Sequence, residues 1–546
     1  MALAAGVAGL GNEFTQDDVG LILQNSRVHQ LTSWRDVLTS PYWPPAFHQE
    51  LYRPLASLFH ALQFDLGGGS PLVFRVTSYL LYMLVSVAVF LLAGRLVPRP
   101  AALAAALLFA AHPVHVEAVA LGVGQSELLV GLLAVCMAIR YIDARRRGAL
   151  TARDWAILAI LYLAACLTKE QGMLLPLPLL ATELFLLPGA STQRARLLWR
   201  GFGFLAGIAV LVVLVRRAVL GGQFSGVLVA EALEGLDVGG RALTMLRVVP
   251  EWARLLLWPA HLQADYSPQE IVASTWFGPR EALGFLLLAG AAAAAWAARR
   301  RAPVFSFGTA WTAIALIPVS NVLVPTGIVL AERTLFLPSL GLMIALSGLV
   351  GALWPRVAGV AWQRKALGVA CAVLVTAGVI RSGARQRVWR DKATLTVNGA
   401  QDAPRSYRAQ LAYGYHLFES GQRDRALETY QLALSLAPRG HGWRIRNDLA
   451  RRFFGVQEPA RAVEQLRASV AEAPERQETW NYLILGLLEL GEYAEGGRMA
   501  EDALARGGEP NMFRDLRNLA DSAARVGAPP GSIRVRVVLG PPPESR

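Results

Sequence analysis

Long apolar runs alternate with short polar segments over the first 381 residues of the chain. Ten runs come near the roughly 17–25 residues that a membrane-spanning helix needs. They lie at about 71–94, 101–121, 127–142, 155–168, 172–188, 200–219, 281–298, 304–324, 334–354 and 366–381. The pattern predicts an all-α fold whose first part, residues 71–381, is a polytopic helical membrane domain.

Basic residues orient these runs, because clusters of arginine mark cytoplasmic loops. Every second loop carries such a cluster: Arg95 with Arg99, Arg145–Arg147, Arg194–Arg200, Arg299–Arg301 and Arg356–Lys365. The segments 1–70, 112–126, 169–171, 220–280 and 325–333 then face outward, and so does the chain after residue 381. We therefore expect a multi-pass protein of the inner (plasma) membrane. The run 243–260 is too charged for a span and is interpreted as a re-entrant or interfacial helix. Arg216-Arg217 does not fit the scheme.

The amino terminus is apolar over Met1–Leu10, which is too short to span a membrane and has no basic residue before it. We interpret residues 1–70 as a first extracytoplasmic loop. We also expect that the spanning helix preceding it is truncated by a start site placed too far downstream.

A 34-residue period follows a polar linker at 382–404. Small residues, an aromatic residue and a closing proline recur in 407–440, 443–476 and 477–510, for example Ala426, Tyr430 and Pro438 in the first unit. This period is typical of tetratricopeptide repeats, each a pair of helices. The sequence predicts three such repeats, an α-solenoid, over 405–510, then a Pro/Gly-rich tail over 511–546.

Charge is unevenly distributed between the two parts. Residues 382–546 contain 44 of the 93 charged residues, although hydrophobic residues make up 54% of the whole chain. Charged residues make up only 17% of the whole chain, whereas soluble domains average about 25%, so the composition argues against an ordinary soluble enzyme. The net charge of +13 does not indicate nucleic-acid binding, because the arginines lie in short loops rather than on one soluble face. The three cysteines lie inside apolar runs and imply no disulfides.

Two adjacent carboxylates, Asp17 and Asp18, stand in the first outward loop. One of them could act as a general base on an acceptor hydroxyl, or the pair could hold a divalent cation. Alternatively they cap a helix that begins near Val19. On the residues alone, capping is the commoner role.

A second polar cluster, His112, His115 and Glu117, closes an apolar run at the outward side. Its composition would suit a metal, but its spacing matches no zinc pattern, so no metal site is predicted. Histidines satisfied at a membrane interface are the commoner case, although ionisable groups at membrane depth often serve a function.

Cations occur in three further outward segments, beside a carboxylate in Lys169-Glu170 and Glu332-Arg333 and without one at Arg53. Each could be a simple ion pair or a snorkelling side chain, or a cation for a lipid-linked phosphate. The topology brings all five polar clusters to one membrane face. Their chemistry would suit sugar transfer from a polyprenyl phosphate, with Arg53, Lys169 or Arg333 neutralising the leaving phosphate and Asp17 or Asp18 taking the acceptor proton. The repeats would hold a peptide acceptor.

Several short motifs occur together in a characteristic order. They are Phe14-x-x-Asp17-Asp18, Tyr52-Arg53-Pro54-Leu55, the segment Phe109–Val119 with His112-Pro-Val-His115-Val-Glu117, Lys169-Glu170, and Ala331-Glu332-Arg333 with Pro338 and Gly341. As a set they resemble the GT-C superfamily of membrane glycosyltransferases, in particular the transmembrane and tetratricopeptide repeat O-mannosyltransferases and their bacterial relatives. The chain departs from that pattern at Gly122–Glu127.

The resemblance implies an inverting glycosyltransferase that moves a monosaccharide, mannose foremost, from a polyprenyl-phosphate donor to an extracytoplasmic acceptor such as a protein Ser/Thr hydroxyl. It implies that the acidic pair holds the catalytic carboxylate, and Asp18 is favoured over Asp17. Arg53, Lys169 and Arg333 would bind the donor phosphate, and His112, His115, Glu117, Glu170 and Glu332 would support the site. No cofactor is required by the pattern, and a divalent cation is left open. The alternative is a non-catalytic, membrane-anchored repeat scaffold for envelope protein assembly.

Overall fold

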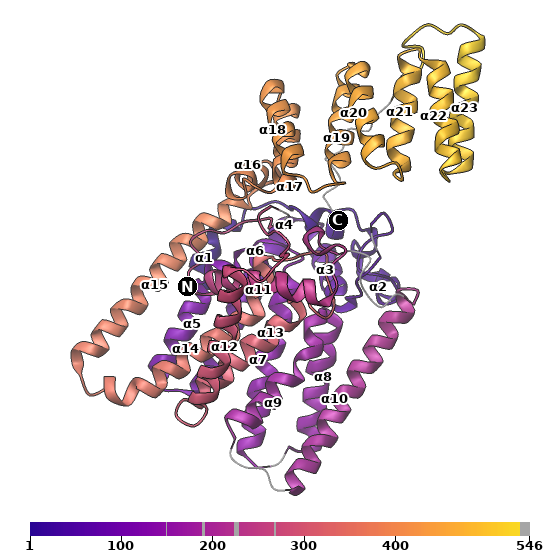
Figure 1. Ribbon diagram of the computed structural model, residues 1–546. Coiled ribbons are helices and arrows are strands. Elements are labelled where there is room, and N and C mark those ends of the chain that lie inside the picture. Colours follow the sequence, from indigo (N-terminus) through magenta and orange to yellow (C-terminus); the bar gives the residue numbers. More distant parts are fainter. Residues whose placement is uncertain (48, 149, 188–191, 223–228, 267–268, 536–546) are drawn as a thin grey trace. The chain divides into compact units, whose positions relative to one another are not determined.

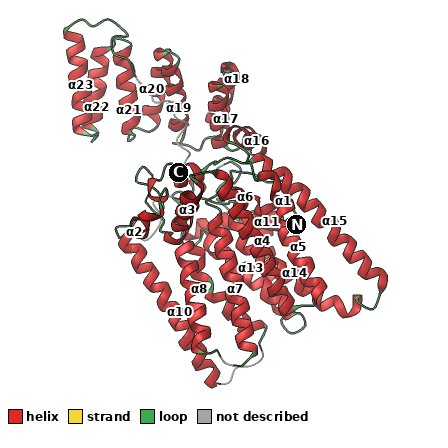
Figure 2. Ribbon diagram, turned by 180° about the vertical axis from the view of Figure 1, so that it is seen from behind, coloured by secondary structure: helices red, strands yellow, loops and turns green. Residues whose placement is uncertain are grey.

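The computed structural model describes residues 1–47, 49–148, 150–187, 192–222, 229–266 and 269–535. Within these ranges the protein is helical and contains no β strand, which confirms the all-α prediction (Figure 2). The chain divides into two compact units, residues 1–266 with 271–398 and residues 267–270 with 399–546.

Unit 1 is built from α1 to α15. The helices are α1 (Ala2–Gly6), α2 (Trp34–Thr39), α3 (Pro54–Gly67), α4 (Pro71–Leu96), α5 (Arg99–Ala111), α6 (Val116–Ala120), α7 (Gln125–Arg146), α8 (Ala152–Thr168), α9 (Pro176–Phe185), α10 (Thr192–Val219), α11 (Val238–Leu257), α12 (Pro279–Ala298), α13 (Pro303–Leu316), α14 (Phe336–Val357) and α15 (Ala361–Val388) (Figure 1). Short helical turns of other types precede several of them, among them η5 (Pro113–His115), η6 (Glu170–Leu174) and η9 (Glu332–Leu335).

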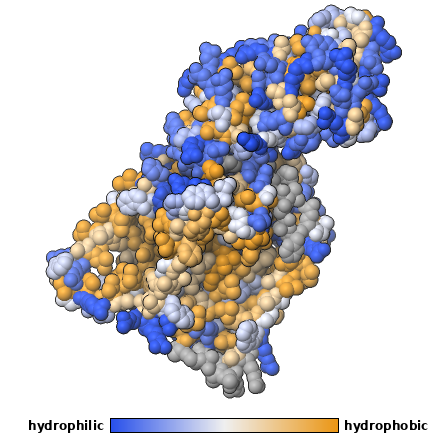
Figure 3. All heavy atoms as spheres, in the orientation of Figure 1, coloured by the Kyte–Doolittle hydropathy of each residue, from blue (hydrophilic) through white to orange (hydrophobic). Residues whose placement is uncertain are grey.

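Five helical segments of the described chain are long and apolar enough to cross a membrane: Pro71–Leu96, Leu198–Val219, Pro279–Ala298, Glu332–Val357 and Ala361–Val388. The bent pair Arg99–Ala111 and Pro113–Ala120 adds a sixth if it counts as one span. Apolar side chains cover the helical part of unit 1 (Figure 3). The protein is therefore a multi-pass membrane protein. The other predicted runs also form helices, but shorter, broken or more polar ones such as α8, α9 and α7.

The run 243–260 forms α11, whose buried residues recur on one face: Thr244, Met245, Val248, Val249, Trp252, Leu255 and Leu256. This face packs on the loops that follow residue 258 and precede η9. An amphipathic helix of this kind suits an interface better than a membrane interior.

Helices α13 and α14 approach each other closely through glycine. A Cβ atom on Gly308 would lie 2.2 Å from the backbone nitrogen of Ala345, and one on Gly341 would lie 2.5 Å from that of Thr312. Small residues permit such contacts between membrane helices, where backbone packing stabilises association. The close pair fixes the start of α14. The turn η9, which contains Glu332 and Arg333, directly precedes that start.

Unit 2 contains helix hairpins with a largely polar exterior (Figure 3). Its helices are α17 (Tyr407–Glu419), α18 (Arg423–Leu436), α19 (Gly442–Gly455), α20 (Pro459–Glu472), α21 (Gln477–Glu489), α22 (Tyr493–Ala505) and α23 (Pro510–Arg525). The first six form pairs whose bounds agree with the three predicted 34-residue units. Small residues such as Ala426, Ala450 and Ala462 are fully buried where helices meet. Assignment of these hairpins to the tetratricopeptide repeats remains a prediction.

Two expected irregular segments are helical. The linker 382–404 is occupied by the end of α15 and by α16 (Lys392–Asp402). The tail expected over 511–546 begins with α23, which buries Phe513, Leu516 and Ala520 in the last core cluster of unit 2. Apolar residues at helical spacing outweigh the local Pro and Gly content up to Arg525. Residues 536–546 of the tail lie outside the described residues.

Candidate active site

Asp18 is fully buried, and both oxygens of its carboxylate accept hydrogen bonds. Its Oδ2 accepts hydrogen bonds from the backbone N–H of Gly122 at 2.9 Å and from Arg75 at 3.2 Å, and its Oδ1 accepts one from the N–H of Val123 at 2.9 Å. Both Asp18 and Arg75 have side chains that are 0% exposed. Burial raises the pKa of Asp18, and Arg75 and the two N–H groups oppose that rise. Asp18 makes no side-chain cap to the turn that starts at Val19, so the capping interpretation does not describe its contacts.

The Gly122–Glu127 segment, where the chain departs from the family pattern, makes this arrangement possible. A Cβ on Gly122 would meet Ile22, Phe74 and Asp18, and a Cβ on Gly124 would meet the carbonyl oxygen of Ala118 at 2.3 Å. Gly122 therefore lets the backbone approach Asp18, and Gly124 lets it pass close to Ala118. The segment acts as a backbone cradle for a buried carboxylate.

Asp17 differs from its neighbour in both exposure and partner. Its side chain is 29% exposed, and its Oδ2 accepts a hydrogen bond from Arg333 at 3.0 Å. Arg333 also pairs with Glu117 at 3.3 Å, and Glu117 accepts a hydrogen bond from the Arg333 backbone N–H at 2.9 Å. At this end of the site two carboxylates share one guanidinium group.

A second group forms around Glu170, at the start of η6. Arg53, just before α3, donates to its carboxylate at 2.7 and 3.0 Å, and Arg216 from the last turn of α10 donates at 2.9 Å. Burial acts against ionisation of Glu170, yet the two arginines hold its pKa at about 2. The ring of Tyr42 lies 5.2 Å from the guanidinium carbon of Arg53. Here two guanidinium groups share one carboxylate.

Lys169 and Glu127 form a third, largely buried ion pair. Burial lowers the pKa of Lys169, Glu127 opposes this, and the charges of Arg53 and Arg333 lower it further. Lys169 is therefore within electrostatic reach of both arginine groups, since such effects decay over a few ångströms to about 10 Å. The three groups belong to one continuous charged site.

His112 and His115 are satisfied by structural partners, and Glu332 has partners at one of its two carboxylate oxygens. His112 bonds the carbonyl oxygen of Leu256 at 2.9 Å, and His115 is held between Tyr82 and Ser339 at 2.8 Å each. Glu332 is fully buried, accepts a hydrogen bond from Tyr266 at 3.1 Å and lies 3.8 Å from Arg385. These side chains fix α5, α11, α14 and α15 around the site and do not add exposed groups to it.

The structure thus brings together Asp17, Asp18, Arg53, Glu117, Lys169, Glu170 and Arg333 from segments far apart in sequence. Arg53 and Glu170 are 117 residues apart, and Asp17 and Arg333 are 316 apart. Sequence reasoning missed Arg216, Glu127 and Arg75 as partners. The poor fit of Arg216 to the charge rule for loops was the one sequence signal that marked it as unusual.

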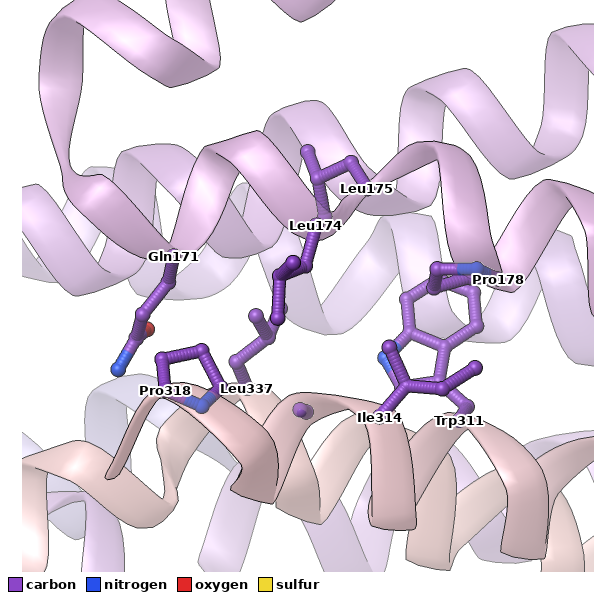
Figure 4. Close-up of a pocket in the computed structure, with 9 residues that line it drawn as sticks. Gln171, Leu174, Leu175, Pro178, Trp311, Ile314, Pro318 and Leu337 are labelled. Carbon is purple, nitrogen blue, oxygen red and sulfur yellow. The ribbon is translucent and has the colours of Figure 1, made fainter. Parts of the chain in front are cut away.

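Within the part of the chain that the structure describes, no group of three or more His, Cys, Asp or Glu side chains is arranged to hold a metal ion. A small apolar pocket is lined in part by Gln171, the residue that follows Glu170. It is lined by residues of η6, α9 and α13 and their neighbours, including Gln171, Leu174, Trp311 and Pro318 (Figure 4).

Comparison with known proteins supports the resemblance found in the motifs. Residues 52–216 match the family model described as dolichyl-phosphate-mannose-protein mannosyltransferase. The human protein O-mannosyl-transferase TMTC3 is 25% identical over 467 residues, covering 78% of this chain and 49% of that protein. Human TMTC1 is 26% identical, with 79% of this chain and 53% of that protein covered. The chain therefore spans about half the length of these curated relatives.

Among solved structures, the chain is similar to ArnT from Cupriavidus metallidurans bound to undecaprenyl phosphate. The two are 16% identical, with 92% of this chain and 78% of that chain covered and a TM-score of 0.38. The motif-based resemblance to membrane glycosyltransferases is confirmed by the family model and the curated relatives.

Proposed function

We propose that this protein is an integral-membrane glycosyltransferase. It moves a monosaccharide, mannose foremost, from a polyprenyl-phosphate donor to a Ser/Thr hydroxyl of a protein outside the cytoplasm, at the plasma membrane. The observation that carries the proposal is the charged site of unit 1, where an exposed carboxylate and several cations from distant segments gather. Similarity to protein O-mannosyl-transferases supports the choice of sugar and acceptor.

Asp17 acts as the general base, in place of the Asp18 that the sequence favoured. Asp18 has no exposed surface, and its oxygens already accept three hydrogen bonds, so an acceptor hydroxyl has no access to it. Asp17 has an exposed carboxylate that Arg333 orients. Asp18 positions its neighbour by tying the first loop to the backbone at Gly122.

The reaction is a single displacement with inversion. The Asp17 carboxylate takes the proton of the acceptor hydroxyl as its oxygen forms a bond to the anomeric carbon. The bond between that carbon and the phosphate oxygen breaks, and the phosphate leaves with the electron pair. Arg53 and Lys169 stabilise the negative charge that develops on the leaving phosphate, a contribution that is largest in a site with little water.

The apolar tail of the donor stays in the lipid bilayer, while its phosphate lies at the charged site. The helix hairpins of unit 2, on the extracytoplasmic side, bind the peptide acceptor.

The full chain in proteoliposomes, given a mannosyl-phosphoryl-polyprenol and a Ser/Thr-rich peptide, tests the proposal. Asp17→Asn lowers turnover about 10²–10⁴-fold, the usual effect of removing a general base. Asp36→Asn, an exposed carboxylate in the same segment, is the matched control and keeps wild-type turnover.

Two results would contradict the proposal in different ways. Full turnover by Asp17→Asn would show that another group takes the proton. No transfer by the wild-type chain, together with unchanged envelope glycoproteins in a deletion strain, would favour the non-catalytic scaffold.

A further inference from the structure

Glu170 is held by two arginines that come from different parts of unit 1. Arg53 makes a bidentate contact with its carboxylate, and Arg216 makes a third hydrogen bond. The Arg216 guanidinium is also fixed from behind, because it donates to the carbonyl oxygen of Glu50 at 2.9 Å. Both guanidinium groups are thus oriented toward one anionic group.

The three side chains are partly accessible, unlike the buried pair of Asp18 and Arg75. The side chains of Arg53 and Arg216 are 14% and 13% exposed and that of Glu170 is 28% exposed, whereas Asp18 and Arg75 are fully buried. A ligand can therefore reach the Glu170 group without unfolding its surroundings.

Charge is polarised along the site. Around Glu170, two guanidinium groups face one carboxylate, and around Arg333, two carboxylates face one guanidinium group. A transferase needs this asymmetry, because the leaving phosphate gains negative charge while the attacking hydroxyl loses a proton. The first end is suited to the phosphate and the second to the acceptor.

The ring of Tyr42 lies beside Arg53, and its hydroxyl lacks a hydrogen-bond partner among the described residues, although the residue is only 3% exposed. Burial raises its pKa, and the charges of Arg53, Asp17 and Glu170 all act on it. A buried hydroxyl without a partner is costly to the free protein. A bound oxygen atom would satisfy it.

We propose that Arg216, together with Arg53, binds the phosphate of the lipid-linked donor, and that Glu170 holds the two guanidinium groups in place until the phosphate takes over. This inference rests on the proposed function and deepens it by adding a phosphate ligand from α10. In the free protein the Glu170 carboxylate takes the place of the phosphate, since both groups accept paired hydrogen bonds from arginine. Tyr42 supplies a further donor to the bound group.

Binding of two lipid probes to the detergent-solubilised full chain tests the inference. One probe is a C55 polyprenyl monophosphate without sugar, and the other is the matching polyprenol without phosphate. Arg216→Gln weakens binding of the phosphate probe by about ten-fold or more, the effect of losing a charge-assisted hydrogen bond, and leaves the polyprenol unaffected. Arg217→Gln, an exposed neighbour on α10, is the control and binds both probes like the wild type.

Glu170→Gln gives the opposite sign and so separates ligand binding from a structural role. The variant tightens binding of the phosphate probe, because no carboxylate competes for the two arginines. If Arg216→Gln does not fold, Arg216→Lys replaces it in the test. That variant keeps the charge but loses the forked donor, and it weakens binding of the phosphate probe alone.

The inference is overturned if Arg216→Gln binds the phosphate probe as well as the wild type does, or if it loses both probes equally. It is also overturned if Glu170→Gln binds the phosphate probe more weakly than the wild type does. The proposed function fails separately if the wild-type chain binds the two probes equally, because the protein would then not recognise a lipid phosphate at all.

Discussion

At the scale of single residues, the two adjacent aspartates show how one peptide bond can separate two roles. Asp17 and Asp18 are chemically the same, but one is exposed beside Arg333 and the other is buried against Arg75 and the backbone at Gly122. One partner of the buried Asp18 is the backbone N–H of Gly122, about a hundred residues later in the chain. The choice of base thus depends on packing, and the residue types do not decide it.

Asp18→Asn should destabilise the protein, because it leaves the buried Arg75 charge without its carboxylate. Removing one partner of a buried ion pair costs roughly 3–5 kcal/mol. Thermal unfolding in detergent should show a clear fall in the melting temperature for Asp18→Asn and little change for Asp17→Asn. Equal melting temperatures for the two variants would contradict the structural role of Asp18.

The pKa of Glu170 gives a stability prediction with a defined sign. Folding lowers this pKa from 4.5 to about 2, so the ionised form is the one that the fold stabilises. The contribution is complete above pH 4.5 and is lost as the pH falls from 4.5 to about 2. Unfolding measured across that interval should therefore be less pH-dependent in Glu170→Gln than in the wild type. Parallel stability curves for the two proteins would contradict the assignment.

At the scale of helices, the α13–α14 pair shows how an element positions the site without contributing to it. Gly308, Gly341 and Gly348 each place backbone where a side chain would otherwise stand. The resulting close contact sets where α14 starts and therefore where Arg333 lies. The position of Arg333, just before α14, thus depends on glycines further along the helix pair.

Gly308→Ala should destabilise the helix pair, because its Cβ would lie 2.2 Å from the nitrogen of Ala345 and the backbone cannot move aside cheaply. Overpacking of this kind costs typically about 1–3 kcal/mol. Gly290→Ala in α12 is the matched control, since its Cβ would meet nothing within 4 Å. A melting temperature that falls for Gly308→Ala alone is expected. An equal effect of the two substitutions would argue against the close contact.

At the scale of the whole molecule, the function depends on membrane topology. The charged site and the helix hairpins of unit 2 belong to separate compact units. A protein acceptor bound by unit 2 can serve the reaction if both units face the same compartment. The positive-inside pattern predicts that both lie on the extracytoplasmic side.

Single cysteines placed on exposed residues test this topology in a background whose native cysteines are replaced by alanine. A membrane-impermeant thiol reagent added to intact cells should label Thr32→Cys in the first loop and Gln431→Cys in unit 2. It should not label Arg300→Cys in the loop between α12 and α13. Labelling of the first two positions from opposite sides would exclude a shared active centre, because the acceptor and the base would be divided by the membrane.

The helices could be predicted from local patterns in the chain. Apolar runs marked the helices of unit 1 and a 34-residue period marked the paired helices of unit 2, since hydrophobic periodicity is a local property of the chain. The sequence also marked Asp17, Arg53, Lys169 and Arg333 as ionisable groups in unusual surroundings. The helical character of 511–525 was missed because nearby Pro and Gly outweighed a regular apolar spacing in the interpretation.

The pairing of the charged groups depends on how the helices pack and could not be predicted from the sequence. That Arg216 joins Arg53 on Glu170, that Glu127 neutralises Lys169, and that Asp18 is buried while Asp17 is exposed all depend on segments tens to hundreds of residues apart. Local patterns show which side chains are charged. How far each is buried and which group it pairs with depend on how the helices pack. The physical reason is that electrostatic energy depends on distance and solvent exposure, and neither quantity is encoded in any one segment.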